Sequence, residues 1–191
     1  MIRLLFAALA GFAFASCATP AEHKLSGTAF DINRLLDAQE DILAGRSIRL
    51  EKEAGVNGST STDTLSPNAG FWTSELAIFR TLDAVNRESG YYIESGPLKD
   101  PQSNLLIRQF TSEAAPLAAV RVYYQDEFRR VRQVEGVVRE QTFLYSTHRT
   151  LRLWFEDDHG SPVLDRYEIQ GYQKVLGRDT VHFFIRARVR W

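Results

Sequence analysis

The sequence contains one cysteine, Cys17, among 191 residues. A single cysteine cannot form an intramolecular disulfide, so packing and backbone hydrogen bonds alone must hold the fold together. An excess of charge of either sign is missing too, because 23 lysines and arginines balance 24 aspartates and glutamates to a net charge of −1. Nucleic-acid-binding proteins need a basic surface. The charge balance therefore argues against nucleic acid as a partner.

Recognisable catalytic motifs are also absent from the sequence. It has no G-x-S-x-G, H-E-x-x-H, Walker A or G-x-G-x-x-G segment, and one cysteine cannot form a C-x-x-C motif. We therefore expect no cofactor, and we predict that the chain is not an enzyme.

Long apolar runs are missing as well. The longest apolar run, residues 4–14, carries no charge and is too short to cross a bilayer as a helix, which needs about 20 apolar residues. Arg3 before the run and small residues after it are typical of a secretory signal peptide. The segment Phe14-Ala15-Ser16-Cys17 resembles the lipobox of bacterial lipoproteins, with phenylalanine where leucine is usual. The resemblance implies cleavage before Cys17 and acylation of its thiol. Cleavage after Ala15 by the A-x-A rule is the alternative.

Cysteine chemistry favours lipidation. Ordinary cleavage would export an unpaired thiol into an oxidising compartment, whereas acylation uses that thiol. The resemblance implies two or three acyl chains, and chains beyond the first make membrane attachment lasting. We therefore expect a lipid-anchored protein of the cell envelope, held at the membrane through acyl chains, such as palmitate, on Cys17. Ala18 replaces the aspartate that marks inner-membrane retention in the lipoprotein sorting pattern. This favours the outer membrane, facing the periplasm.

Composition indicates one folded domain behind this anchor. Hydrophobic residues make up 44% of the chain and charged residues 25%, which is ordinary globular usage. The expected organisation is a signal peptide at 1–16, the lipidated cysteine with a flexible tether at 17–27, and a single domain at 28–191.

Periodicity predicts an α+β fold with two N-terminal helices followed by an antiparallel meander of about six strands. The first helix runs from a cap at Asp31 to about Ala44, and the second spans about 69–87. Residues 47–53 read as a strand, and Asn57-Gly58 indicates either a hairpin or a mobile loop. Gly136 suggests a bulge or bend. The sheet is expected to curl around the second helix, with strands near 104–111, 117–124, 128–138, 141–155, 163–176 and 181–191.

This helix-then-meander order resembles a group of uncharacterised single-domain envelope lipoproteins. The similarity includes Phe143-Leu144-Tyr145-Ser146 and the segment Tyr167-Glu168-Ile169-Gln170-Gly171-Tyr172-Gln173-Lys174. It implies no particular activity.

Three arginines form the main candidate binding site. Arg186, Arg188 and Arg190 alternate with apolar residues, so their side chains share one face of the last strand. Three guanidinium groups can bind phosphate or carboxylate, as in lipid headgroups or a cell-wall polymer. The favoured interpretation is nevertheless a solvated strand face whose charges discourage edge pairing, and anion binding is the alternative. In one hairpin register, Glu168 lies opposite Arg188.

Two aromatic residues raise the question of a cavity. Trp72 and Phe79 are expected to face inward, where they either fill a core or line a pocket for a hydrophobic ligand. A filled core is the favoured interpretation.

Two further clusters of polar residues are explained more simply by local structure than by metal binding or catalysis. Asp157, Asp158 and His159 are weak candidates for a metal site and read more simply as a hairpin tip, so no metal is expected. Ser146 and His148 share one strand face but lie about 7 Å apart along the strand, too far for a nucleophile–base pair.

Three functions stay open at this point. The first is a non-catalytic domain that binds an envelope protein or polymer. The second is a carrier of a lipid or other hydrophobic ligand in a half-barrel cavity. The third is a cell-wall or lipid hydrolase.

Overall fold

The computed structural model describes residues 22–25, 29–128 and 130–191. The expected signal peptide, the lipidation site Cys17 and most of the expected tether lie outside these residues. Among the helices described, none has both the length and the apolar character needed to cross a membrane.

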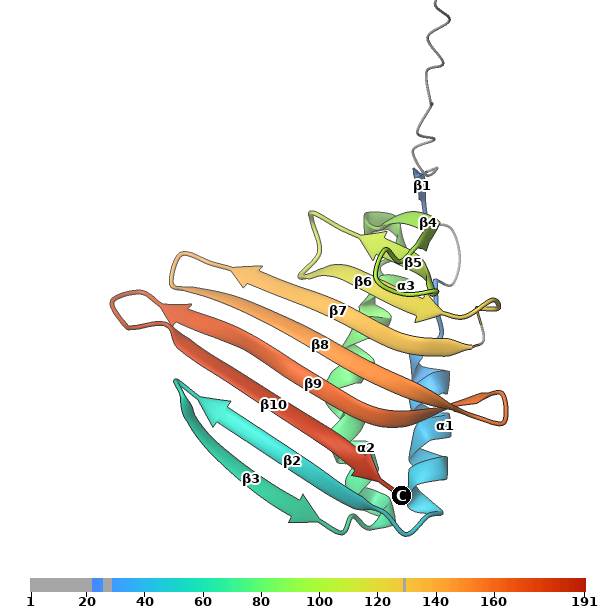
Figure 1. Cartoon of the computed structure of the whole chain (residues 1–191). Helices are drawn as coiled ribbons and strands as arrows, with labels where there is room; N and C mark the ends of the chain where they lie inside the picture. The colour runs from blue at the N-terminus through green and yellow to red at the C-terminus, as the bar shows by residue number, and fades with distance from the viewer. Residues whose placement is uncertain (1–21, 26–28, 129) are drawn as a thin grey trace, which may run out of the picture.

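One antiparallel sheet dominates the described part of the chain (Figure 1). Its ten strands follow the order β1-β4-β5-β6-β7-β8-β9-β10-β2-β3. The strands are β1 (Glu22–Lys24), β2 (Arg49–Val56), β3 (Ser59–Leu65), β4 (Ile93–Lys99), β5 (Leu106–Thr111), β6 (Leu117–Tyr124), β7 (Val131–Gln141), β8 (Tyr145–Asp158), β9 (Ser161–Val175) and β10 (Val181–Arg190).

The expected fold class, two N-terminal helices followed by a six-strand meander, is therefore wrong. The β2–β3 hairpin closes through a two-residue Asn57-Gly58 turn with positive φ angles and then joins the sheet beside β10. At the other edge, β4 forms where no strand was predicted, and β1 forms within the expected tether. The pairings of β2 with β10 and of β1 with β4 join distant segments, which local periodicity does not encode.

The helical segments cover one face of this sheet (Figure 1). Helix α1 (Ile32–Ala44) begins as predicted at Asp31, whose carboxylate accepts the backbone N–H of Arg34 at 2.9 Å. The expected continuous second helix, at about 69–87, is instead divided into α2 (Ala69–Leu76), the 3₁₀ helix η1 (Ala77–Asp83) and α3 (Ala84–Arg87). A second 3₁₀ helix, η2 (Ser89–Tyr91), follows.

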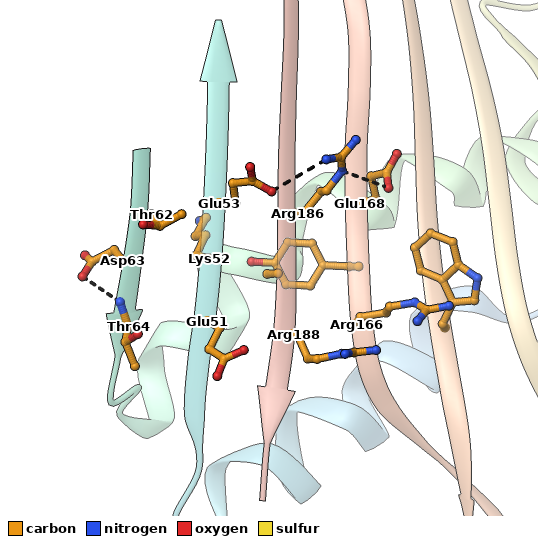
Figure 2. Close-up of a pocket in the computed structure, with 13 residues that line it drawn as sticks. Glu51, Lys52, Glu53, Thr62, Asp63, Thr64, Arg166, Glu168, Arg186 and Arg188 are labelled. Carbon is orange, nitrogen blue, oxygen red and sulfur yellow. Dashed lines mark hydrogen bonds and ion pairs between the residues drawn. The ribbon is translucent and has the colours of Figure 1, made fainter. Parts of the chain in front are cut away.

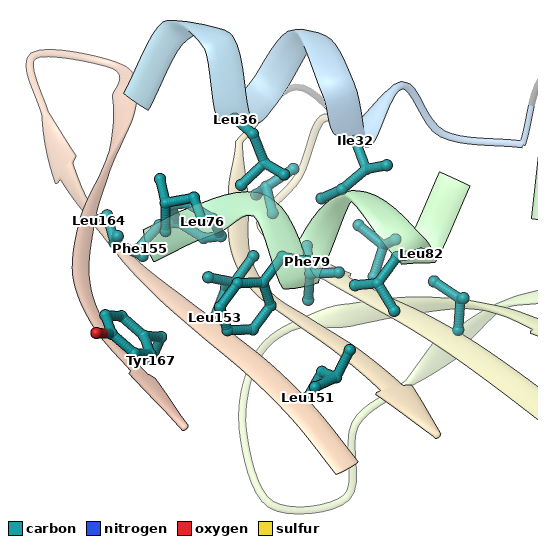
Figure 3. Packing of buried hydrophobic residues seen from close by; sticks show 14 of the residues in the cluster. Ile32, Leu36, Leu76, Phe79, Leu82, Leu151, Leu153, Phe155, Leu164 and Tyr167 are labelled. Carbon is teal, nitrogen blue, oxygen red and sulfur yellow. The ribbon is translucent and has the colours of Figure 1, made fainter. Parts of the chain in front are cut away.

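A three-residue repeat explains the 3₁₀ turn. Leu76, Phe79, Leu82 and Val85 recur every third residue and are all buried. A 3₁₀ helix has three residues per turn, so this spacing places Phe79 and Leu82 of η1 on one face, with Leu76 at the end of α2 and Val85 in α3 on either side of them. That face packs against the sheet (Figure 3).

Gly136 lets the helical segment approach the sheet closely. A Cβ atom at this position would overlap the side chain of Leu82 in η1. The predicted bulge or bend at Gly136 is wrong, because it pairs in regular register with Val120 on one side and Leu151 on the other. The missing side chain makes room for Leu82, and β7 stays regular at that position.

Candidate functional site

A row of alternating charges crosses the face of the sheet that the helices leave open. Its six residues lie directly opposite one another on neighbouring strands, in the order Arg121, Glu135, Arg152, Glu168, Arg186 and Glu53. Glu135 accepts from Arg121 and from Arg152, both at 2.7 Å. Opposite charges at directly paired positions stabilise a sheet. We call these six residues the charged row.

A groove of about 450 Å³ lies on the same open face, over β2, β3, β8, β9 and β10 (Figure 2). Part of the charged row forms one side of it. The other side contains Trp154, Arg166 and Arg188, and Thr62 and Thr64 line it from the edge strand β3.

Two arginines face each other inside this groove. Arg166 on β9 pairs directly with Arg188 on β10, so like charges lie opposite one another. Asp165 is the carboxylate near both, at 4.0 Å from Arg166 Nη1 and 3.9 Å from Arg188 Nε. These distances are at the limit of ion pairing, and both arginine side chains are more than 40% exposed. The pair therefore leaves a local excess of positive charge, which suits a carboxylate or phosphate group.

The neighbours of the two arginines favour a ligand above them. The Arg166 guanidinium lies over the Trp154 ring, 4.7 Å from its centre, and this cation–π contact helps to hold it in place. Glu51 also lies opposite Arg188, but its carboxylate is 2.8 Å from Arg190. The hydrogen bond from Arg190 lowers the pKa of Glu51, so this carboxylate stays ionised and paired.

A β-bulge in β9 positions Asp165 beside Arg166. Trp154 pairs with Arg166 and Phe155 with Leu164, so Asp165 is the extra residue of the bulge. The bulge turns Leu164 into the core, where it is fully buried, while Arg166 lines the groove and Asp165 lies 3.9 Å from Arg188.

Helix α1 holds this bulge from the other face of the sheet. The side-chain amide of Gln39 donates to the Pro162 carbonyl at 2.9 Å and accepts the Leu164 N–H at 2.8 Å. Gln39 is only 1% exposed. It thus satisfies two buried backbone groups of β9 beside the bulge, which couples the position of α1 to that of the groove.

The three predicted arginines do not act as one cluster. Arg186 lies 3.5 Å from Glu168 and 3.7 Å from Glu53 as part of the charged row. The hairpin register that would place Glu168 opposite Arg188 does not occur, because Glu168 lies opposite Arg186. Arg190 is paired with Glu51, which leaves Arg188 as the member of the three that has another arginine opposite it.

Trp72 and Phe79 lie in the packed interior. Both are 0% exposed, so neither lines a space that admits water. The Phe79 ring meets the Tyr167 ring edge-on with centroids 5.7 Å apart, and Trp72 meets Phe71 in the same way at 5.4 Å. These contacts place both residues in the core.

The candidate metal residues lie in and beside the β8–β9 turn. Arg132 donates to Asp157 at 3.0 Å and Arg46 to Asp158 at 2.7 Å, while His159 is almost fully exposed. Within the described ranges, no three His, Cys, Asp or Glu side chains are grouped to hold a metal.

Ser146 and His148 line a wider groove of about 1340 Å³ near one end of β8. His148 packs edge-on against Tyr172, with ring centroids 5.7 Å apart. In the described part of the chain, Ser146 and His148 share no hydrogen bond.

The sequence alone did not identify Trp154, Asp165 and Arg166 as residues of the site. A signal for the bulge was present, because Val163-Leu164 followed by Asp165-Arg166 breaks the apolar–polar alternation of a strand. No sequence signal identified Arg166 as the residue opposite Arg188, because that pairing requires the register of β9 against β10.

No family model matches this chain, and comparisons with curated proteins and with solved structures likewise give no match.

Proposed function

We propose that this chain is a lipid-anchored, non-catalytic binding protein of the cell envelope. In this proposal, the groove binds a carboxylate- or phosphate-bearing polymer of the envelope, and Cys17 carries the acyl chains. The lipobox-like segment before Cys17 supports the anchor. The binding site is proposed because Arg166 and Arg188 lie directly opposite each other, and the carboxylate near both, Asp165, lies at the limit of ion pairing with each.

The shape of the groove supports a polymer as the ligand. It lies open along the sheet and combines guanidinium groups with the Trp154 indole and threonine hydroxyls. Guanidinium groups bind anionic substituents, and hydroxyls exchange hydrogen bonds with polar substituents. The packed core around Phe79 gives no support to the alternative of a hydrophobic-ligand carrier.

Replacing Arg166 and Arg188 by glutamine should weaken binding of the full-length chain to purified anionic cell-wall fragments. We expect an affinity loss of roughly tenfold or more, because a hydrogen bond to a charged group contributes about 1.5–3 kcal/mol. Titration calorimetry at two salt concentrations measures the loss, and the salt dependence should decrease with it.

The matched control is Arg34→Gln with Arg87→Gln, which removes two exposed guanidinium groups from the helices and leaves binding unchanged. Replacing Arg186 and Arg190 should cost less than replacing Arg166 and Arg188, because both are already paired with carboxylates. If R166Q/R188Q binds the fragments as tightly as the parent chain, the groove is not the binding site.

The anchor has its own test. Intact-mass analysis of the protein from its native envelope should give a chain that begins at Cys17 and carries the mass of its acyl chains. A chain that begins at Ser16 with a free thiol would disprove lipidation.

A further inference from the structure

The turns of three neighbouring hairpins lie at one end of the sheet (Figure 1). Apolar side chains are exposed at these turns. In the β7–β8 turn, Phe143 is 88% exposed and Leu144 is 62% exposed, while Leu176 in the β9–β10 turn is 66% exposed. Of the ten exposed large hydrophobic residues in the described chain, seven belong to three adjoining hairpins: Val56, Phe143, Leu144, Tyr145, Val175, Leu176 and Val181. We call Phe143, Leu144 and Leu176 the apolar tips.

Hydrogen bonds join the apolar tips into one unit. The Leu176 N–H donates to the Leu144 carbonyl at 2.9 Å, which links the two turns. Within the β7–β8 turn, the Thr142 hydroxyl accepts the N–H groups of Leu144 and Tyr145, and the Thr142 N–H donates to the Tyr145 carbonyl. A loop that enters an apolar medium must satisfy its backbone polar groups internally. These bonds meet much of that requirement.

Basic residues flank the apolar tips. Residues 139–149 and 172–182 contain four lysines and arginines against two acidic residues. Lys174 and Arg178 lie on either side of Leu176 and are exposed. An apolar apex with basic flanks matches the layered chemistry of an anionic bilayer, in which hydrocarbon lies beneath negative headgroups.

We propose that the apolar tips insert into the interfacial layer of an anionic lipid bilayer. The apolar tips project from separate turns. A bilayer can take up separate side chains because it needs no complementary surface, whereas a stable protein interface buries about 800 Å² on each partner. This contact is distinct from both the acyl anchor and the groove. It orients the sheet with its hairpin end toward the membrane and leaves the groove open at the side.

The single native cysteine makes a site-specific test direct. In the full-length chain with Cys17→Ser, Phe143→Cys provides one labelling site for an environment-sensitive fluorophore. On vesicles of phosphatidylethanolamine and phosphatidylglycerol, we expect a blue-shifted emission, a several-fold gain in intensity and quenching by spin-labelled acyl chains. The control is His159→Cys in the same background, because His159 is 99% exposed in the β8–β9 turn at the opposite end of the sheet. Both chains keep the same N-terminal residues, so attachment through those residues affects both equally.

A second variant tests the apolar side chains themselves. Leu144→Ser with Leu176→Ser, in the labelled Phe143→Cys chain, should lower vesicle partitioning at least tenfold, because it replaces two of the three inserted apolar side chains by polar ones. Tyr91→Ser removes an exposed aromatic residue outside the three hairpins and should leave partitioning unchanged. The proposal is overturned if the label at 143 responds to vesicles no more than the label at 159, or if the leucine variant partitions like its parent. Loss of cell-wall binding by R166Q/R188Q is independent of either result.

Discussion

Replacement of Phe79 by alanine is expected to lower the free energy of unfolding by about 3–5 kcal/mol. Phe79 has no exposed surface, and its ring packs edge-on against Tyr167 in the core (Figure 3). Truncation would remove that contact and leave a cavity between η1 and the sheet, which surrounding side chains fill only in part. Urea denaturation of the parent and the Phe79→Ala chain measures the difference.

The same experiment separates a binding protein from a carrier of hydrophobic ligands. Phe143→Ala makes the same chemical change at a side chain that is 88% exposed, and should alter stability by less than about 0.5 kcal/mol. If Phe79→Ala also had so small an effect, the space around residue 79 would be loosely packed, as in a ligand cavity. That result would support a carrier of hydrophobic ligands instead of the proposed binding protein.

Replacement of Glu75 by alanine is expected to cost about 2–4 kcal/mol of stability. Its Oε1 atom accepts hydrogen bonds from Lys52 Nζ and from the Tyr167 hydroxyl, which joins α2 to β2 and β9. Tyr167 is 1% exposed, and burial, together with Glu75, raises the pKa of its hydroxyl. Without the carboxylate, a buried hydroxyl and a half-buried ammonium would lose their partner. Urea denaturation near pH 7 reports the loss.

Two variants show whether the unpaired groups cause this loss. Glu75→Gln keeps one acceptor oxygen and should be less destabilising than Glu75→Ala. Adding Lys52→Met to Glu75→Ala should recover part of the stability, because it removes the unpaired ammonium. Glu113→Ala, at an exposed position, is the control for loss of a carboxylate. No recovery in the double variant would contradict this account of the cluster.

The contrast between Gly136 and Gln39 shows the limits of prediction from this sequence. Gly136 was recognised as unusual and Gln39 lies within the predicted first helix, yet neither role was predictable. Gly136 makes room for Leu82, and Gln39 bonds to backbone groups of a strand more than 120 residues away. Each role depends on a contact between distant segments, and periodicity reports only which face of an element is buried.

The candidate site was predictable only to the same extent: the sequence shows which face a side chain is on, but not which residues lie opposite it. Alternation along β10 correctly placed Arg186, Arg188 and Arg190 on one face, because side chains alternate along any strand. Which charges lie opposite them depends on register, and a shift of two residues keeps the same face while changing every partner. The opposition of Arg166 to Arg188 therefore could not be derived before the strands were paired.

The sequence by itself determined the local features of this protein. The Asp31 cap, the Asn57-Gly58 turn and the approximate positions of β5 to β10 follow from side-chain chemistry and periodicity over a few residues. Only the tertiary structure decided that β2–β3 pairs with β10, that a charged row crosses the open face, and that apolar hairpin tips meet at one end. The physical reason is that a strand's pattern selects which face is buried, whereas its neighbours are selected by the packing of the whole chain.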